Sequence, residues 1–393
     1  MAWLLSRVAA AALYLVLVLT VTTSTSPAAA QRFPARARPT RSGYLNVTST
    51  NSLYFAFYEA TDPVTTPPTA APLLLGPYLL NSTALSRNRK RWNRRFGVIF
   101  IDNPLGSGFS APASEADIPR DEPTIAAHLL AALQSFMALD GRFRARPLFL
   151  TGESYAGKYI PAATKHILDA NDRLPVDQRV NLQGIGIGNG MTHPIAQVTV
   201  HADQAYFAGL INAKQKATVE AMQNRTVSLV RAGNWTGARK ERNGIISFLP
   251  RVTGVATSFN YSRERPYPTR PLLDFLNSDE AKAALGARRD VAWVRCSKAD
   301  IMRSAKRDVE AVLARNGTAR VLLFQGVFDL HSAPAGRRLA GYVQRSGALA
   351  NVVIVGAGHM AAGDNRPAAQ AMIEGWVLQT GPFAGAGARS STS

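Results

Sequence analysis

The feature that most constrains the fold is a short apolar strand that runs directly into a tight Gly-x-Ser turn and then a helix. The strand covers Pro147–Leu150, residues 152–157 read Gly-Glu-Ser-Tyr-Ala-Gly, and the helical pattern extends to about Asp169. Such a turn lifts the serine hydroxyl above the sheet, beside a helix N-terminus that favours negative charge. Gly-x-Ser-x-Ala alone also fits an ordinary strand-to-helix turn, but its place after a buried strand favours a nucleophilic Ser154.

Other short apolar runs repeat this strand signal along the chain. They are typical of strands buried on both faces of a parallel sheet, and they cover Leu53–Tyr58, Leu73–Leu75, Val98–Ile101, Leu182–Ile187, Val321–Phe324 and Val352–Val355. Helical spacing covers Ile125–Leu139 and Val309–Ala314. The alternation predicts an α/β fold with a doubly wound, mainly parallel central sheet.

The composition of the chain changes several times and predicts its domain organisation. Residues 1–30 have a short positive start, an apolar run and a small-residue end, the layout of a secretory signal peptide. The run is too short to favour a membrane anchor. Residues 31–190 and 301–383 are expected to form the two parts of the core, with 31–42 as a flexible entry. The more polar residues 191–300 are expected to form a helical insertion, a cap over the functional edge of the sheet, and 384–393 a disordered tail.

Six Asn-x-Ser/Thr sequons accompany the leader and predict a glycoprotein with these asparagines on its surface. They lie at Asn46, Asn81, Asn224, Asn234, Asn260 and Asn316. The single cysteine, Cys296, excludes an intrachain disulfide and fits a small buried side chain. We therefore expect the protein to enter the secretory pathway and to be extracellular or vacuolar.

The net charge of +19 favours binding to acidic polysaccharides through a basic surface. The densest basic run, Arg87–Arg95, carries no nucleic-acid motif and is expected to be a solvated loop. No histidines gather with acids or cysteine at metal-ligand spacing, so no metal or cofactor is expected. No stable membrane anchor is expected either.

A serine nucleophile needs a base, and the base needs an orienting acid. Asp329 follows the strand VLLF, and His359 follows VVIV, so both lie at strand exits on the same edge as Ser154. Each alone also fits a simpler role, a turn-forming aspartate or a polar residue in a Gly-rich turn. The chain order of serine, acid and base together favours a catalytic triad.

These segments resemble the serine carboxypeptidases, of the α/β-hydrolase fold, and the plant-type carboxypeptidase-like branch most of all. The resemblance rests on Gly43-Tyr44-Leu45, LYFAFYEA at 53–60, FIDNPLGSGFS at 100–110, GESYAGKYIP at 152–161, GIGIGNGMT at 184–192, GVFD at 326–329 and GAGHM at 356–360. They occur in the family's order over nearly the whole chain after the leader. The resemblance implies that the Tyr155 backbone N–H is an oxyanion donor, and that Glu153 binds the terminal carboxylate of the substrate, best at acidic pH.

The chain departs from the family after PLLL, where the family continues into a Gly-rich loop. Here Leu75 is followed directly by Gly76-Pro77-Tyr78. In the family this loop supplies a second oxyanion donor, an asparagine for the substrate carboxylate and a partner for the glutamate at position 153. Losing one oxyanion donor costs about 100- to 1000-fold in turnover. A true variant and a skipped exon fit the sequence equally.

Three functions therefore stay open at this point. The first is a secreted serine-type carboxypeptidase that acts on peptide or protein C-termini through an acyl-enzyme. The second is a carboxypeptidase-like acyltransferase that takes acyl groups from sugar esters. The third is a weakly active or inactive secreted glycoprotein that binds peptides or acidic polymers, as the missing loop would allow.

Overall fold

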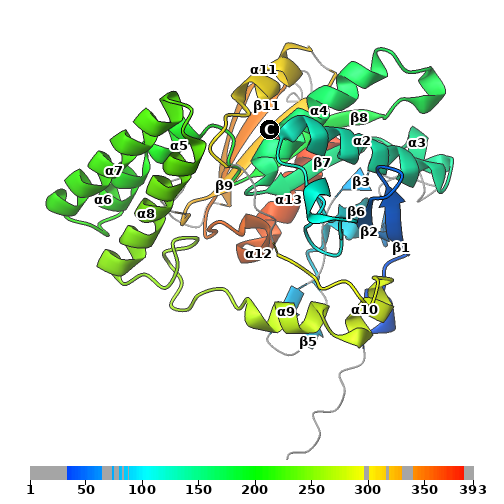
Figure 1. Cartoon of the computed structure of the whole chain (residues 1–393), viewed down its shortest axis with the longest axis horizontal. Helices are drawn as coiled ribbons and strands as arrows, with labels where there is room; N and C mark the ends of the chain where they lie inside the picture. The colour runs from blue at the N-terminus through cyan, green and yellow to red at the C-terminus, as the bar shows by residue number, and fades with distance from the viewer. Residues whose placement is uncertain are drawn as a thin grey trace, which may run out of the picture.

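The computed structural model describes residues 33–63, 73–74, 79–81, 84–86, 88–295, 301–315, 318–329 and 340–384. Within these residues a nine-stranded sheet runs through the molecule in the order β1-β2-β6-β3-β7-β8-β9-β11-β10 (Figure 1). Its strands are β1 (Arg41–Asn46), β2 (Ser52–Tyr58), β3 (Leu73–Leu74), β6 (Gly97–Ile101), β7 (Leu148–Glu153), β8 (Leu182–Gly188), β9 (Arg320–Gly326), β10 (Gly341–Ser346) and β11 (Leu349–Ile354). A separate hairpin pairs β4 (Leu79–Asn81) with β5 (Ala84–Ser86).

The centre of the sheet, from β6 to β11, is parallel, and both of its edges are antiparallel. The expected mainly parallel sheet is confirmed. All six apolar runs that predicted strands lie in or overlap strands of this sheet. Parallel pairing places the carboxyl ends of β7, β8, β9 and β11 at one edge, where the loops that follow them meet.

Helices cover both faces of the sheet. One face carries α2 (Glu122–Ala138), α4 (Ala156–Asn171) and α11 (Lys306–Ala314), whose apolar residues share one core with the strands. The other carries α13 (Arg366–Leu378), whose buried Trp376 packs edge-on against Phe149 of β7. The short helices α3 (Arg142–Ala145) and α12 (Ala361–Asp364) complete these layers.

A helical lobe projects from one end of the core (Figure 1). In the chain it lies between β8 and β9. It consists of α5 (Pro194–Val198), α6 (His201–Phe207), α7 (Ala213–Arg231) and α8 (Trp235–Thr253), which share a small apolar core of their own. Two further helices, α9 (Arg270–Leu276) and α10 (Asp279–Leu285), lie beneath the sheet in Figure 1. Short 3-10 helices cover Ala35–Ala37, Trp92–Arg94, Glu115–Asp117, Val176–Gln178 and Gly381–Phe383.

Two expectations about surface segments are wrong. Residues 41–42 belong to β1 rather than to a flexible entry, because β1 pairs along its whole length with β2. The basic run at 88–95 is not simply a solvated loop. Arg91 is buried and its guanidinium donates to Thr61, while Arg94 pairs with Glu374 at 3.0 Å.

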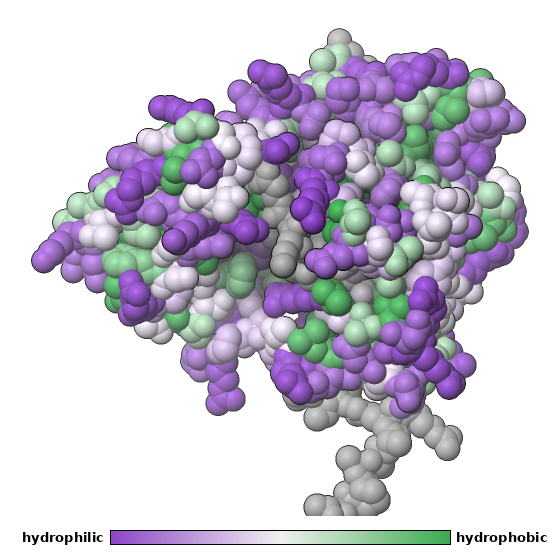
Figure 2. Space-filling model, in the orientation of Figure 1, coloured by the Kyte–Doolittle hydropathy of each residue, from purple (hydrophilic) through white to green (hydrophobic). Residues whose placement is uncertain are grey.

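Several predictions from the sequence fall outside the described residues. These are the signal peptide at 1–30, the join from Leu75 to Tyr78, Cys296, Asn316 and the tail beyond Ala384. Among the residues that are described, no helix is long and apolar enough to cross a membrane. Hydrophilic side chains cover most of the face shown in Figure 2, over the helical lobe and the core alike, with apolar side chains in small groups.

A buried ion pair fixes the turn that leads into β7. Arg146 is 1% exposed, and its two terminal nitrogens each lie 2.9 Å from a carboxylate oxygen of Glu59 at the end of β2. The guanidinium also lies over the rings of Phe57 and Phe143, 5.8 Å from each centroid. Two parallel hydrogen bonds and two aromatic faces compensate a charge that water no longer solvates.

Replacing Arg146 with alanine should therefore destabilise the fold. We expect the free energy of unfolding to fall by about 3 kcal/mol. Removing one partner of a buried ion pair typically costs about 3 to 5 kcal/mol, and the lower value applies because Glu59 keeps some contact with water. Urea unfolding of Arg146→Ala measures it. The matched control is Arg142→Ala, since Arg142 is exposed and pairs with Asp140 on the surface. Equal effects of the two substitutions would contradict a structural role for the buried pair.

Candidate active site

Ser154 lies in the turn between β7 and α4, with a backbone that few non-glycine residues adopt. Its φ is 61°, in the left-handed region. The Ser154 N–H donates to the Gly188 carbonyl at 2.9 Å, and the Ser154 carbonyl accepts from the Met191 N–H at 2.9 Å. A Cβ at Gly152 would lie 2.5 Å from the Ala156 Cβ, so the small residues at these positions do allow strand and helix to pack closely.

Asp329 and His359 meet at the same edge of the sheet. The His359 Nδ1 lies 2.8 Å from Asp329 Oδ2. Asp329 is fully buried and His359 is 3% exposed. The backbone N–H of His359 donates to the Phe259 carbonyl at 2.6 Å, and the Phe259 ring packs on the imidazole with centroids 4.9 Å apart. The imidazole is thus held on one nitrogen by a carboxylate, which leaves Nε2 as the nitrogen able to exchange a proton.

The charges around His359 favour its protonated form. Burial by itself lowers the pKa of His359, and Arg242 of α8 lowers it further. The hydrogen bond with Asp329 and the negative charges of Asp329 and Glu153 outweigh these effects, so the pKa lies above its ordinary value of 6.5. A base of this kind takes up a proton readily and stabilises it once it is there.

Glu153 directly precedes Ser154, and its carboxyl group is close enough to interact with His359. Burial, reinforced by the charges of Asp329 and Asp364, raises the pKa of Glu153 to about 7, although His359 and a hydrogen bond from the Ala361 N–H oppose the shift. Below neutral pH the group is therefore a neutral carboxylic acid that can donate a hydrogen bond to an anion.

Tyr155 is the N-cap of α4, a helix of 16 residues. Its carbonyl accepts from the Lys158 N–H at 2.9 Å, and its hydroxyl donates to Glu122 at 3.1 Å. The positive end of the helix dipole therefore lies next to the Ser154 side chain, where it stabilises a developing oxyanion.

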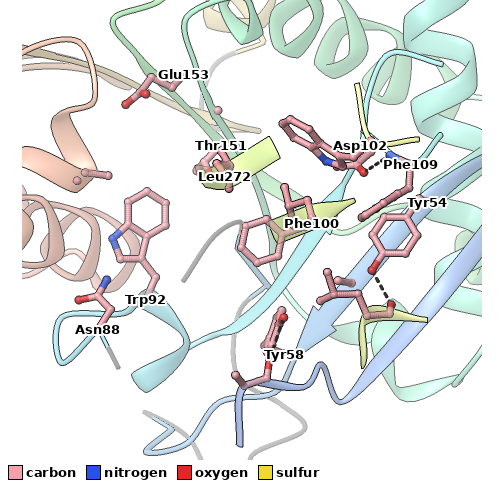
Figure 3. Close-up of a pocket in the computed structure, with 18 of the residues that line it drawn as sticks. Tyr54, Tyr58, Asn88, Trp92, Phe100, Asp102, Phe109, Thr151, Glu153 and Leu272 are labelled. Atoms are coloured by element: carbon pink, nitrogen blue, oxygen red, sulfur yellow. Dashed lines mark hydrogen bonds between the residues drawn. The ribbon is translucent and has the colours of Figure 1, made fainter. Parts of the chain in front are cut away.

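A large cavity of about 610 Å³ opens beside Glu153 (Figure 3). Most of its walls are apolar or aromatic, and they include Tyr54, Tyr58, Trp92, Phe100, Phe109, Leu272, Phe275 and Trp293. Asp102 is a second carboxyl group in its lining. Asp102 accepts from the Phe109 N–H at 2.8 Å, and burial raises the pKa of Asp102 to about 7. This cavity can hold a bulky apolar group beside Glu153.

Three residues near the site were not predicted from the sequence. Asn189, at the end of β8, donates from its side-chain amide to the His359 carbonyl at 2.7 Å. Asp364 accepts from the Gly358 N–H at 2.9 Å and from the Tyr267 hydroxyl at 2.7 Å. Arg242 lines a small cavity together with His359. The Gly-Asn-Gly at the end of a predicted strand was a usable signal for Asn189, whereas Arg242 lies in the middle of a polar helix with no local pattern.

The sequons differ in their surroundings. Asn46, Asn224 and Asn234 are exposed. The prediction of a surface asparagine is wrong for Asn260, which is 4% exposed. Its amide nitrogen donates to Asp364 at 3.0 Å, and its oxygen accepts from the Ser262 hydroxyl at 2.6 Å. Attachment of a glycan would break this buried contact. The side chains of Asn81 and Asn316 lie outside the described residues.

The described residues contain no group of three or more His, Cys, Asp or Glu side chains that could hold a metal ion. The described residues place a strained serine, a hydrogen-bonded histidine–aspartate pair and a carboxyl group with a pKa of about 7 at the same edge of the sheet. This set is suited to acyl transfer through a covalent serine intermediate.

Known proteins resemble this chain in sequence and in fold. The family model described as serine carboxypeptidase matches residues 30–338 and 331–379. Serine carboxypeptidase-like 50 of Arabidopsis thaliana is 40% identical over 418 residues, covering 92% of each chain. A probable serine carboxypeptidase CPVL of Dictyostelium discoideum is 31% identical over 66% of this chain and 53% of its own. Among solved structures, a prohormone-processing carboxypeptidase, Kex1(delta)p of Saccharomyces cerevisiae, superposes with a TM-score of 0.72 at 19% identity, over 86% of this chain and 91% of that one.

The coupling between Glu153 and His359 gives a direct prediction. Glu153→Gln removes one of the carboxylate charges that raise the pKa of His359, so this pKa should fall. An NMR titration of the imidazole C–H signals measures it, with His359→Asn used to assign the peak. The surface variant Glu310→Gln should leave the titration unchanged. A His359 pKa that is the same in Glu153→Gln as in wild type would show that the two groups do not interact.

Proposed function

Because the chain belongs to the serine carboxypeptidase family, we propose that it releases C-terminal residues from peptides through an acyl-enzyme on Ser154. The observation that carries the proposal is the buried Asp329–His359 hydrogen bond at the edge of the sheet where Ser154 adopts its strained turn. Family membership supports a peptidase, and this geometry supports the residue roles.

In the proposed reaction the Ser154 Oγ attacks the last peptide carbonyl carbon, and His359 Nε2 accepts the hydroxyl proton. The tetrahedral intermediate collapses, the C–N bond breaks, and His359 returns the proton to the leaving amine. Water then attacks the ester carbonyl, again with His359 as base, and Ser154 is released. Asp329 keeps the imidazole oriented and stabilises its charged form throughout.

Two neighbours of Ser154 complete the proposed site. The Tyr155 N–H, at the start of α4, would donate to the oxyanion of the tetrahedral intermediate. The Glu153 carboxyl, neutral below about pH 7, would donate a hydrogen bond to the substrate's terminal carboxylate. The large cavity beside Glu153 would take the leaving residue, and its aromatic walls favour a bulky apolar side chain.

The missing Gly-rich loop lowers the activity that we expect. The alignment with the Arabidopsis relative covers 418 residues and the chain has 393, so the relative contains residues that this chain lacks. This difference fits a loop that is absent from this chain, and both a true variant and a skipped exon would produce it. The join at Leu75–Tyr78 lies outside the described residues. With only one backbone oxyanion donor, we expect turnover about 100- to 1000-fold below that of an enzyme with both.

We further propose that the protein enters the secretory pathway and carries glycans. The leader-like residues 1–30 and the exposed sequons at Asn46, Asn224 and Asn234 support this. The net charge of +19 supports retention by acidic polysaccharides. Binding that weakens steeply with added salt would distinguish this charge effect from a specific carbohydrate site.

The triad can be tested by covalent labelling. An organophosphonate with a fluorophore should label wild-type protein on Ser154, and Ser154→Ala should not be labelled. Asp329→Asn should fold but label and hydrolyse peptides about ten-thousandfold more slowly, because the imidazole loses its orienting carboxylate. Mass spectrometry of the labelled peptide identifies the residue. Folded wild-type protein that takes up no label would argue for a binding protein instead.

The role of Glu153 predicts a pH dependence of KM. For a peptide ending in phenylalanine, KM should rise as the pH passes upward through about 7, because ionised Glu153 repels the substrate carboxylate. In Glu153→Gln the side chain is neutral at every pH, so most of the rise in KM over about pH 5 to 8 should be lost. The C-terminal amide of the same peptide is the control and should show no such rise. A rise in KM that persists in Glu153→Gln would assign the effect to another group.

A further inference from the structure

The turn that ends β8 has an unusual backbone and a fully engaged side chain. It consists of residues 188–191, Gly-Asn-Gly-Met, and Asn189 adopts a φ of 42°. Asparagine and glycine are the residues that tolerate this left-handed conformation best. Asn189 is 7% exposed, so its amide group must find its partners within the protein.

The Asn189 side chain joins two loops that come from distant parts of the sequence. Its Nδ2 donates to the His359 carbonyl at 2.7 Å and lies 3.4 Å from the Gly358 carbonyl. Its Oδ1 accepts from the Gly326 N–H at 3.1 Å. Gly326 is three residues before Asp329, so one amide group connects the segment that carries the acid to the segment that carries the base.

The backbone of the same turn holds the serine. The Gly188 carbonyl accepts from the Ser154 N–H, and the Met191 N–H donates to the Ser154 carbonyl, both at 2.9 Å. The Asn189 N–H in turn donates to the Phe324 carbonyl of β9 at 2.8 Å. Three of the four residues of this turn thus contact the segments that carry Ser154, Asp329 and His359.

Few other side chains could replace this amide. It must donate at one end and accept at the other, from a backbone with positive φ. Aspartate has nearly the same shape, but its second oxygen would face two carbonyl oxygens and repel them. Glycine keeps the backbone conformation and removes both hydrogen bonds.

We propose that Asn189 is a positioning residue that fixes the distance of His359 from Ser154 and Asp329, a role that rests on the proposed function. The His359 backbone is held at its N–H by Phe259 and at its carbonyl by Asn189, and its ring by Asp329. Loss of the Asn189 contact removes one of these three hydrogen bonds that hold His359. A shift of the base by about 1 Å costs on the order of 100-fold in rate.

The expected effect falls on kcat rather than on KM. Asn189 does not line the large cavity beside Glu153, so substrate binding there should not depend on it. The variants Asn189→Gly and Asn189→Asp should lower kcat and the rate of phosphonate labelling by about 10- to 100-fold, with KM within about twofold of wild type.

Asn171 provides a matched control for loss of an amide contact. Asn171 is the last residue of α4, at the end of the helix far from Ser154. Its Nδ2 donates to the Val180 carbonyl at 2.8 Å, and its Oδ1 accepts from the Val180 N–H at 2.9 Å. Asn171→Gly should lower the thermal midpoint much as Asn189→Gly does and leave kcat and labelling unchanged. A folded Asn189→Gly that labels as fast as wild type would overturn the positioning role.

A second readout does not depend on activity. The groups that set the His359 titration are Asp329, Glu153 and Arg242. If Asn189 positions the imidazole, Asn189→Gly weakens the hydrogen bond to Asp329, and the NMR titration of His359 should move toward ordinary values. If wild type takes up no label but this shift occurs, the proposed function fails and the positioning role stands. An unchanged titration in Asn189→Gly overturns the positioning role whether or not the protein is active.

Discussion

The buried hydrogen bond between Asp329 and His359 is the interaction on which the rest of the site depends. A fully buried carboxylate is stable only when its charge is compensated. Here the partner is an imidazole whose pKa the same carboxylate raises. The contact requires the ends of β9 and β11 to approach closely. A Cβ at Gly326 would lie 2.2 Å from the Gly358 carbonyl oxygen, so glycine is needed at that position.

Glu153 is a further ionisable group whose protonation is coupled to that of His359. Its pKa of about 7 and the raised pKa of His359 mean that each group's charge affects the other near neutrality. At acidic pH Glu153 is neutral, and His359 then loses one of the charges that hold its proton. The base therefore becomes easier to deprotonate under the conditions in which Glu153 can bind a carboxylate. Because the pKa of His359 is raised, its imidazole is mostly protonated at acidic pH and then cannot act as the base, so Glu153 and His359 set opposing pH limits on function.

The centre of the sheet and the strand-exit residues were predictable because their sequence signals are local. Strands buried on both faces, such as β6 and β11, have continuous apolar runs, and Ser154 follows one of them directly. The edge strands β1 and β10 were not predicted, since edge strands are half exposed and mix polar with apolar residues. The contacts of Asn189, Asn260 and Arg242 join residues more than one hundred positions apart, which periodicity cannot reveal.

The position of the helical lobe separates two kinds of evolutionary change. β8 and β9 are neighbours in the sheet, yet residues 189–319 lie between them in the chain. Because strand pairing fixes the two ends, this long excursion can gain, lose or reshape helices without moving the exits of β7 and β9. The lobe can therefore diversify among descendants while the reacting groups stay under purifying selection. The exceptions are the parts of the excursion that contact the core or the site, among them the turn up to Met191, which is held to Ser154 and His359, Phe259, which holds His359, and α11, which packs in the main core.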